Sequence, residues 1–297
     1  MDEKVFVMVK ITDDVNAGFS RSFLLNVYPH SSTKKKTMSS DDAKIGIVGG
    51  AGPYAGLDLA QKILQQTRAE NDQDYLPTLL ISTPDQIEDR TRFLLGEITS
   101  NPAHAIYRNL SDLTTLGASV AGIPCNTAHA PAIRDVFLQK MKQSGNHIKI
   151  LDMIAETIAF MQEACPEVKT VGVLSTIGTW KAGFYPELLS ASGYETRTLN
   201  EAQQQHLHDE ALFNPEYGIK VQAHPVTEEA REVLLEGVDI LEKQGVQAII
   251  LGCTEIPLGL PERKIGETFF LDPGLILARA LIREFRPEKL LPWTWEI

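Results

Sequence analysis

Two of the three cysteines in this 297-residue chain follow short apolar runs in matching positions. Cys125 comes two residues after the run 119–123, and Cys253 comes two residues after the run 248–251. Small polar residues follow each of them directly. A thiolate takes up a proton and a thiol releases one. Two thiols on opposite sides of one cleft therefore suit proton transfer at both faces of a carbon.

The third cysteine, Cys165, stands at the end of an expected helix and has no such counterpart. Free cysteines are among the residue types most often buried, so we interpret Cys165 as structural. A redox disulfide between Cys125 and Cys253 stays open as an alternative, although the C-x-x-C spacing of redox motifs is missing. The spacing of the cysteines does not indicate a metal site either.

An internal repeat relates the two thiols. The glycine-containing segment 45–56 resembles 171–183 at an offset of 126, and 117–127 resembles 245–255 at an offset of 128. Three matched segments in the same order, the third being 150–152 with 270–272, predict two similar halves. If the halves face each other about a pseudo-two-fold axis, Cys125 and Cys253 lie on opposite sides of one cleft.

The elements that must position these thiols alternate along the chain. Short, unalternated apolar runs are typical of parallel strands buried on both faces, and segments of helical length separate them. We therefore predict an α/β fold with two pseudo-symmetric, doubly wound domains, parallel sheets of about four strands each, and the active site in the cleft between them. The expected strands are 45–48, 78–81, 119–123, 148–151, 171–174, 248–251 and 268–271, and the expected helices include 57–68, 131–142, 152–164 and 227–244.

The domain boundaries follow from this pattern. Residues 1–43 form a disordered leader or N-terminal extension, because the polar, aperiodic stretch 31–42 reads as a linker. The first α/β domain comprises 44–149 together with 265–297, and the second comprises 150–264.

Composition excludes several classes of function. The formal net charge of −11 argues against nucleic acid or an anionic membrane as a partner. An apolar run near the ~18 residues that span a bilayer is missing, and so is a signal-peptide pattern. Three cysteines are too few for a disulfide scaffold, which favours a cytoplasmic protein.

Five motifs together resemble the aspartate/glutamate racemase superfamily, the cofactor-independent racemases, and the aspartate racemase branch in particular. The resemblance runs from Lys44 to the C-terminal helices. The motifs are Gly49-Gly50-Ala51-Gly52-Pro53, Glu88-Asp89-Arg90-Thr91, Pro124-Cys125-Asn126-Thr127-Ala128-His129, Tyr217-Gly218-Ile219-Lys220 and Gly252-Cys253-Thr254-Glu255.

The resemblance implies a racemase that interconverts L- and D-aspartate, and glutamate as a possible second substrate, with no cofactor and no metal. One of Cys125 and Cys253, as thiolate, takes the α-proton, and the other, as thiol, returns a proton on the opposite face. A homodimer is the family's usual assembly. The implied residues that bind the anionic amino acid are Arg90, Lys220, Gly50, Gly52, Asn126, Thr127, Thr254, Ser82, Asp89 and Thr176.

Several positions depart from the family's usual residues. Ser82 stands where Asn is frequent, and Glu255 stands where glutamate racemases usually carry His, which leans away from the dedicated glutamate racemases and leaves the choice between aspartate and glutamate open. His129 is interpreted as a local structural hydrogen-bonder. The glycine loop lacks the G-x-G-x-x-G spacing, and Pro53 removes a backbone N–H, so dinucleotide binding is disfavoured. Two alternatives stay open: a decarboxylase or cis/trans isomerase of small dicarboxylates on the same fold, and a non-catalytic amino-acid-binding protein.

Overall fold

The computed structural model describes residues 5–10, 22–27 and 43–295. The chain forms two compact units, 1–41 and 42–297. In the first unit, strands β1 (Val5–Lys10) and β2 (Ser22–Val27) pair antiparallel. The expected strands include none in this segment, and the expected leader or N-terminal extension stays a prediction. The polar stretch 31–42, predicted to be a disordered linker, lies outside the described residues.

The second unit contains two sheets. In the described part of the chain, the first sheet has four parallel strands in the order β4-β3-β5-β6. Its central strand β3 is buried at every position after Lys44, as expected for a strand covered on both faces. The strands are β3 (Lys44–Gly49), β4 (Thr78–Ser82), β5 (Ala118–Gly122) and β6 (Lys149–Ile150).

The second sheet has five described strands in the order β10-β11-β9-β7-β8. Parallel pairing joins β11, β9, β7 and β8, while β10 pairs antiparallel with β11 at the edge. Its strands are β7 (Thr170–Ser175), β8 (Glu195–Thr198), β9 (Ala248–Gly252), β10 (Lys264–Ile265) and β11 (Thr268–Leu271).

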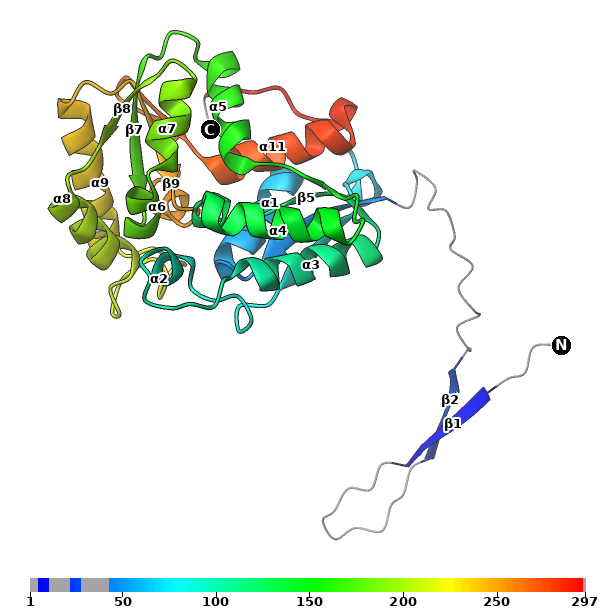
Figure 1. The fold of residues 1–297 in the computed structure, drawn as a ribbon. Helices are drawn as coiled ribbons and strands as arrows, with labels where there is room; N and C mark the ends of the chain where they lie inside the picture. The colour runs from blue at the N-terminus through cyan, green and yellow to red at the C-terminus, as the bar shows by residue number, and fades with distance from the viewer. Residues whose placement is uncertain (1–4, 11–21, 28–42, 296–297) are drawn as a thin grey trace. The chain divides into compact units, whose positions relative to one another are not determined.

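Helices connect the strands and cover both sheets (Figure 1). The α-helices are α1 (Pro53–Gln66), α2 (Arg90–Leu94), α3 (Ala103–Thr115), α4 (Pro131–Gln143), α5 (Met153–Ala164), α6 (Ile177–Ala182), α7 (Phe184–Ala191), α8 (Glu201–His206), α9 (Glu228–Lys243), α10 (Ile256–Gly259) and α11 (Pro273–Phe285). Short 3₁₀ turns lie at η2 (Asp72–Asp74), η3 (Asn126–His129) and η5 (Pro287–Lys289), and η4 (Leu207–Leu212) is a π-helical turn.

The predicted α/β fold with parallel sheets is confirmed. Each expected apolar run coincides with a strand, and the four expected helices coincide with α1, α4, α5 and α9 to within a few residues. The second sheet is larger than predicted because it includes two edge strands, β8 and β10. Strand β8 reads Glu-Thr-Arg-Thr and is only half-buried, so a search for apolar runs does not detect it.

Strand β11 and helix α11 belong to different halves of the molecule. Strand β11 pairs with β9 in the second sheet, although the expected division assigned 265–297 to the first domain. Helix α11 packs on α1, α5 and β5 (Figure 1). Apolar side chains of α11 share one buried cluster with Ile45 and Ile47 of β3 and with Val171 and Val173 of β7. The two sheets therefore share a core, and the chain crosses between them just after β11.

The repeat of 150–152 with 270–272 corresponds to two equivalent helix starts. Asp152 caps α5 by accepting hydrogen bonds from two backbone N–H groups, at distances of 2.9 and 3.1 Å. Asp272 caps α11 in the same way, at 2.8 and 3.1 Å. A capping carboxylate of this kind stabilises a helix by about 1 kcal/mol. The aspartates therefore fix where α5 and α11 begin in each half.

Candidate active site

A cavity of about 300 Å³ lies where the loops after β3, β5, β7 and β9 meet. These loops follow the carboxyl ends of parallel strands, which is where open α/β sheets bind ligands. Both Cys125 and Cys253 line the cavity, one from each sheet. Eleven of the twelve predicted site residues line it: Cys125, Cys253, Arg90, Lys220, Gly50, Gly52, Asn126, Thr127, Thr254, Asp89 and Thr176.

Ser82 is the exception. This residue was predicted to form a hydrogen bond with the substrate, but it is not among the described residues that line the cavity. It is the last residue of β4, is exposed, and pairs in register with Gly49. The segment that follows it supports the glycine loop instead. A Cβ atom on Gly50, whose φ is +88°, would come within 2.7 Å of the Thr83 backbone nitrogen. Glycine at position 50 is therefore required by both its backbone conformation and its contact with Thr83.

The loop 49–52 leads into helix α1. Gly52 is the residue before the helix and Pro53 occupies its first turn, where a missing N–H costs nothing. The guanidinium of Arg90 donates to the carbonyl oxygen of Ala51 through Nη2 and to that of Glu88 through Nη1. Arg90 thus ties the glycine loop to helix α2, at whose start it lies.

Arg90 is also the cation beside Cys125. Burial lowers the pKa of the Arg90 guanidinium, but the negative charge of a Cys125 thiolate and of Asp89 outweighs burial, so the pKa is raised. Among the described residues, the Nε atom of Arg90 is buried and has no hydrogen-bond partner. Arg90 is therefore charged and retains a donor for a ligand in the cavity.

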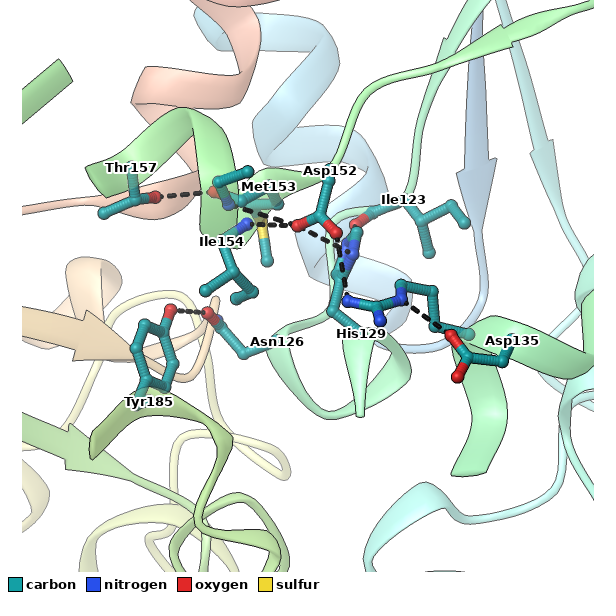
Figure 2. Close-up of polar contacts among 11 residues, drawn as sticks. Ile123, Asn126, His129, Asp135, Asp152, Met153, Ile154, Thr157 and Tyr185 are labelled. Carbon is teal, nitrogen blue, oxygen red and sulfur yellow. Dashed lines mark hydrogen bonds and ion pairs between the residues drawn. The ribbon is translucent and has the colours of Figure 1, made fainter. Parts of the chain in front are cut away.

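Asn126 follows Cys125 and begins the 3₁₀ turn η3. Its side-chain oxygen accepts a 2.5 Å hydrogen bond from the hydroxyl of Tyr185 on α7 (Figure 2). That bond fixes the orientation of the amide. Its Nδ2 atom is buried without a partner in the described part of the chain. Because a buried amide N–H without a partner is costly, Asn126 retains a donor for a bound ligand.

His129 lies under the same loop and does not line the cavity. One ring nitrogen, Nε2, contacts the carbonyl oxygen of Ile123 at 3.2 Å, and the other, Nδ1, lies 3.6 Å from Asp152 (Figure 2). Burial lowers the pKa of His129, so the imidazole is neutral at physiological pH. These contacts fit the interpretation of His129 as a structural residue that links the Cys125 loop to the start of α5.

Threonine hydroxyls join the two halves beside the cavity. The Oγ1 atom of Thr127, from the first half, lies 2.9 Å from that of Thr179 and 3.4 Å from that of Thr176, both from the second half. Thr176 also caps α6 through the backbone N–H of Thr179. Thr254 donates to the carbonyl oxygen of Pro124 at 3.3 Å, which links the two cysteine loops directly.

Cys253 has a different environment from that of Cys125. Its Sγ atom donates to Oε2 of Glu255 at 3.2 Å, and Glu255 is buried. The other carboxylate oxygen, Oε1, lies 2.9 Å from Nζ of Lys220. The ammonium of Lys220 also lies 5.3 Å from the centre of the Phe213 ring, which is a favourable cation–π distance.

The charges of this group determine its protonation. Burial raises the pKa of Glu255, but attraction to Lys220 outweighs burial, so the pKa lies below its ordinary value. Burial lowers the pKa of Lys220, yet attraction to Glu255 raises it above its ordinary value. Burial and the nearby Glu255 carboxylate raise the pKa of Cys253. Lys220 and Glu255 are therefore an ion pair, and Cys253 is a neutral thiol at physiological pH.

The sequence predicts that Lys220 binds the substrate and does not assign Glu255 to the site. The structure pairs the two, so Lys220 reaches the cavity with part of its donor capacity already used. The position of Glu255, two residues after Cys253, was the available signal. Other cavity-lining residues outside the prediction are Ala51, Pro53, Tyr54, Pro84, Ile87, Thr91 and Phe213.

The described residues contain neither a metal-binding cluster nor a membrane-spanning helix. Within residues 5–10, 22–27 and 43–295, no three His, Cys, Asp or Glu side chains gather so that they could hold a metal ion. In the same part of the chain, no helix has the length and apolar character to cross a bilayer.

Comparison with known proteins identifies the family. A family model described as Asp/Glu/hydantoin racemase matches residues 48–281, most of the chain. The chain belongs to this racemase family. The match begins near the end of β3 and includes both cysteine loops, so every residue that lines the cavity lies inside it.

Individual relatives are distant. A glutamate racemase of Corynebacterium glutamicum is 27% identical over 187 residues, which are 59% of this chain and 60% of that protein. The broad specificity amino-acid racemase RacX of Bacillus subtilis is 26% identical over 155 residues, 51% of this chain and 62% of RacX. The matched regions thus span about three fifths of the length of these two curated relatives.

Solved structures extend the likeness. An aspartate racemase from Picrophilus torridus is 27% identical, with a TM-score of 0.64 over 84% of this chain and 100% of that chain. A Francisella tularensis glutamate racemase in complex with D-glutamate is 19% identical, with a TM-score of 0.55 over 86% and 85% of the two chains. At that identity the second likeness shows the shared fold alone.

Proposed function

We propose that this protein interconverts L- and D-aspartate, with glutamate as a second substrate, by moving the α-proton between Cys125 and Cys253 without a cofactor. One observation carries the proposal: two thiols from the two halves of the repeat line the same cavity. Membership of the racemase family and the likeness to the Picrophilus torridus aspartate racemase support it.

The proposed reaction begins with a thiolate at Cys125, beside the positive charge of Arg90. The thiolate removes the α-hydrogen as a proton, which leaves the electron pair on the α-carbon and a thiol on Cys125. The thiol of Cys253 then delivers its proton to the opposite face and becomes a thiolate. Inversion requires removal and delivery on opposite faces, and two fixed groups achieve this without turning the substrate.

Cavity donors are available for the carboxylates of an acidic amino acid. Arg90 has a buried Nε–H, and Asn126 has a buried Nδ2–H, for which the described residues supply no partner. Lys220 is paired with Glu255, but an ammonium has three N–H donors and can also contact a carboxylate. Two cations that line one cavity are consistent with a dicarboxylate substrate in a protein of net charge −11.

The remaining expectations about the protein are also proposals. The family resemblance supports a homodimer in the cytoplasm, and sedimentation of the purified chain tests the oligomeric state. The division into a first domain of 44–149 with 265–297 and a second of 150–264 is retained as a proposal except at β11, which pairs in the second sheet.

Proton NMR in D₂O tests the proposed function. The purified protein is incubated with L-aspartate, and separately with D-aspartate, without pyridoxal phosphate. The expected result is deuterium at the α-position together with loss of optical purity, and repetition with glutamate measures the preference between the two acids. A lack of exchange with either enantiomer of both acids overturns the proposal.

Two alternative functions have distinct signatures when the same purified protein is given other compounds. Conversion of an arylmalonate or of maleate, with no amino-acid exchange, indicates a decarboxylase or a cis/trans isomerase. Saturable binding of aspartate without α-exchange indicates a binding protein.

A further inference from the structure

Glu255 is a buried carboxylate with polar contacts on both oxygens. Oε2 accepts from Sγ of Cys253 at 3.2 Å and also lies 3.3 Å from Oγ1 of Thr254, whose single proton goes either to Glu255 or to the Pro124 carbonyl oxygen. Oε1 is held by Nζ of Lys220 at 2.9 Å. Burying an unpaired carboxylate is costly, so Lys220 is the reason why Glu255 can stay ionised at this position.

The glycine loop confines this carboxylate from the other side. A Cβ atom on Gly52 would overlap Oε1 of Glu255. Gly52 has an extended backbone that any residue adopts, with φ −156°. The need for glycine at position 52 therefore comes from the close approach of the Glu255 side chain. Contacts from Gly52, Lys220 and Thr254 leave the carboxylate little freedom to turn away from Cys253.

The hydrogen bond between Cys253 and Glu255 has a defined direction. An ionised carboxylate only accepts, so the sulfur must carry the proton. If Cys253 lost that proton, two negative charges would face each other about 3 Å apart in a buried site. The arrangement therefore favours the thiol and opposes the thiolate.

The repeat shows that this feature belongs to one half only. In the match between 117–127 and 245–255, Thr127 stands where Glu255 stands. Thr127 is uncharged, and its hydroxyl bonds to Thr179 at 2.9 Å. Cys125 is the largest of the charges that raise the pKa of the Arg90 guanidinium, so a cation lies beside this thiol. Cys125 thus lies beside a cation, whereas Cys253 bonds to a carboxylate that is itself paired with Lys220.

We propose that Glu255 is a positioning residue that holds Cys253 as the thiol in the free protein, so that Cys253 starts as the proton donor and Cys125 as the acceptor. The direction of transfer rests on the proposed racemisation, whereas the state of the Cys253 thiol does not. The free protein is then ready for the enantiomer whose α-hydrogen faces Cys125.

One turnover reverses the two thiols. Cys125 ends with the α-proton, and Cys253 ends as a thiolate beside Glu255. Return to the starting state requires Cys125 to release a proton to solvent and Cys253 to take one up. The equilibrium constant of racemisation is one, so kcat/KM is equal in the two directions. The difference between the two thiols therefore appears in the separate values of kcat and KM for each enantiomer and in how those values change with pH.

The test titrates the Cys253 thiol directly. Cys125→Ser with Cys165→Ala leaves Cys253 as the sole thiol of the chain. The ultraviolet absorbance of the thiolate is followed against pH, with and without Glu255→Gln, which keeps an acceptor oxygen and removes the charge. We expect Glu255→Gln to lower the titration midpoint by at least about one pH unit, or about tenfold more thiolate at a given pH.

Glu262→Gln in the same background is the matched control. Glu262 is also paired with a cation, Arg231, at 2.6 Å, but it does not line the cavity. We expect the control to leave the midpoint unchanged. A folded Glu255→Gln protein whose midpoint equals that of its parent overturns the proposal, because a carboxylate that merely anchors Lys220 would not set the titration of Cys253.

A second measurement uses the unaltered protein and does not depend on the folding of a variant. Iodoacetamide alkylation is followed at Cys253 by mass spectrometry across a series of pH values. We expect alkylation of Cys253 to rise only at pH values above the ordinary thiol value of about 8.5. Half-maximal alkylation at or below that ordinary value overturns the proposal.

These thiol readouts separate the two proposals. Absence of α-proton exchange with every amino acid rejects the racemase function, yet the Cys253 titration still reports on Glu255. If the protein is a racemase, the basic limb of its kcat/KM profile should also move to lower pH in Glu255→Gln. Failure of that limb to move, with racemisation intact, rejects the role of Glu255 alone.

Discussion

The Cys125 loop and the Cys253 loop are repeat counterparts, but their surroundings differ. Both follow a central strand and both thiols are buried, at 7% and 5% exposure. The Cys125 loop is held by neutral hydrogen bonds to Tyr185 and Thr179, with Arg90 as the nearby charge. The Cys253 loop contains the Glu255–Lys220 ion pair. A shared backbone thus positions two identical groups, and the charged neighbours make them chemically different.

The largest expected effect concerns the thiol that each of the two loops carries. Cys125→Ser and Cys253→Ser should each lower two-way racemisation by about 10³-fold or more, because each removes an acid/base group that the other thiol cannot replace. The matched control is Cys165→Ala, since Cys165 is buried and bonds to the Met161 carbonyl oxygen outside the cavity. Chiral chromatography of aspartate measures the rates. Full activity in either serine variant contradicts the two-thiol mechanism.

The ion pair of the Cys253 loop should contribute to stability in a pH-dependent way. Lys220→Met leaves Glu255 buried without its counter-charge, which should cost about 3–5 kcal/mol at pH 7. The folded pKa of Glu255 is lowered, so its contribution is present above the unfolded value of about 4.3 and is lost as pH falls through the folded pKa. Urea unfolding should therefore show a smaller difference from the native chain below about pH 4.

Lys243→Met is the control for that difference. Lys243 pairs with Asp239 on the surface, where an ion pair contributes well under about 1 kcal/mol. A loss for Lys220→Met as small as that for Lys243→Met, or a difference that does not change with pH, contradicts the account of the Glu255–Lys220 pair.

Substitution of Arg90 tests the charged neighbour of the Cys125 loop. Arg90→Lys keeps the charge but loses the planar fork that bonds to the Ala51 and Glu88 carbonyl oxygens. A charged hydrogen bond contributes about 1.5–3 kcal/mol, so kcat/KM for aspartate should fall about 10- to 100-fold. Arg92→Lys, on the same helix but outside the cavity, should leave kcat/KM unchanged. Equal kinetics for the two variants would remove Arg90 from the site.

The smallest expected effect concerns the neutral support of the Cys125 loop. Tyr185→Phe removes the hydroxyl that orients Asn126, a loss of about 1 kcal/mol, so KM should rise about fivefold with kcat changed less. Thr254→Val removes the hydrogen bond from the Cys253 loop to the Pro124 carbonyl oxygen, and its KM and kcat are compared with those of Tyr185→Phe. Unchanged kinetics in Tyr185→Phe would show that the amide of Asn126 does not contact the substrate.

Much of the fold could be predicted because buried parallel strands have apolar sequences. The strands β3, β5, β7 and β9, which precede the cavity loops, all have such sequences. The internal repeat predicted that both cysteines lie in one cleft. Strand β8 escaped because its residues are polar and half-buried. The position of β11 could not be derived, since an apolar run does not specify which sheet it joins.

The site residues show a similar limit. Gly50 and Gly52 were predicted as substrate-binding positions, yet the structure gives each a steric reason: Gly50 faces the Thr83 backbone and Gly52 faces Glu255. Glu255 was recognised only as a departure from histidine, because its partnership with Lys220 joins residues far apart in the chain. Ser82 was chosen by motif alone, and its strand ends outside the cavity. Sequence spacing locates a loop but does not give the pairing of charges within it.

Isotope exchange in the single-thiol variants tests the central claim most directly, namely that the two thiols act on opposite faces of one carbon. Cys253→Ser and Cys125→Ser are each incubated in D₂O with L-aspartate and with D-aspartate. Each variant should introduce α-deuterium into one enantiomer without inverting it, and the two variants should select opposite enantiomers. Exchange of both enantiomers by one variant, or selection of the same enantiomer by both, would contradict the account.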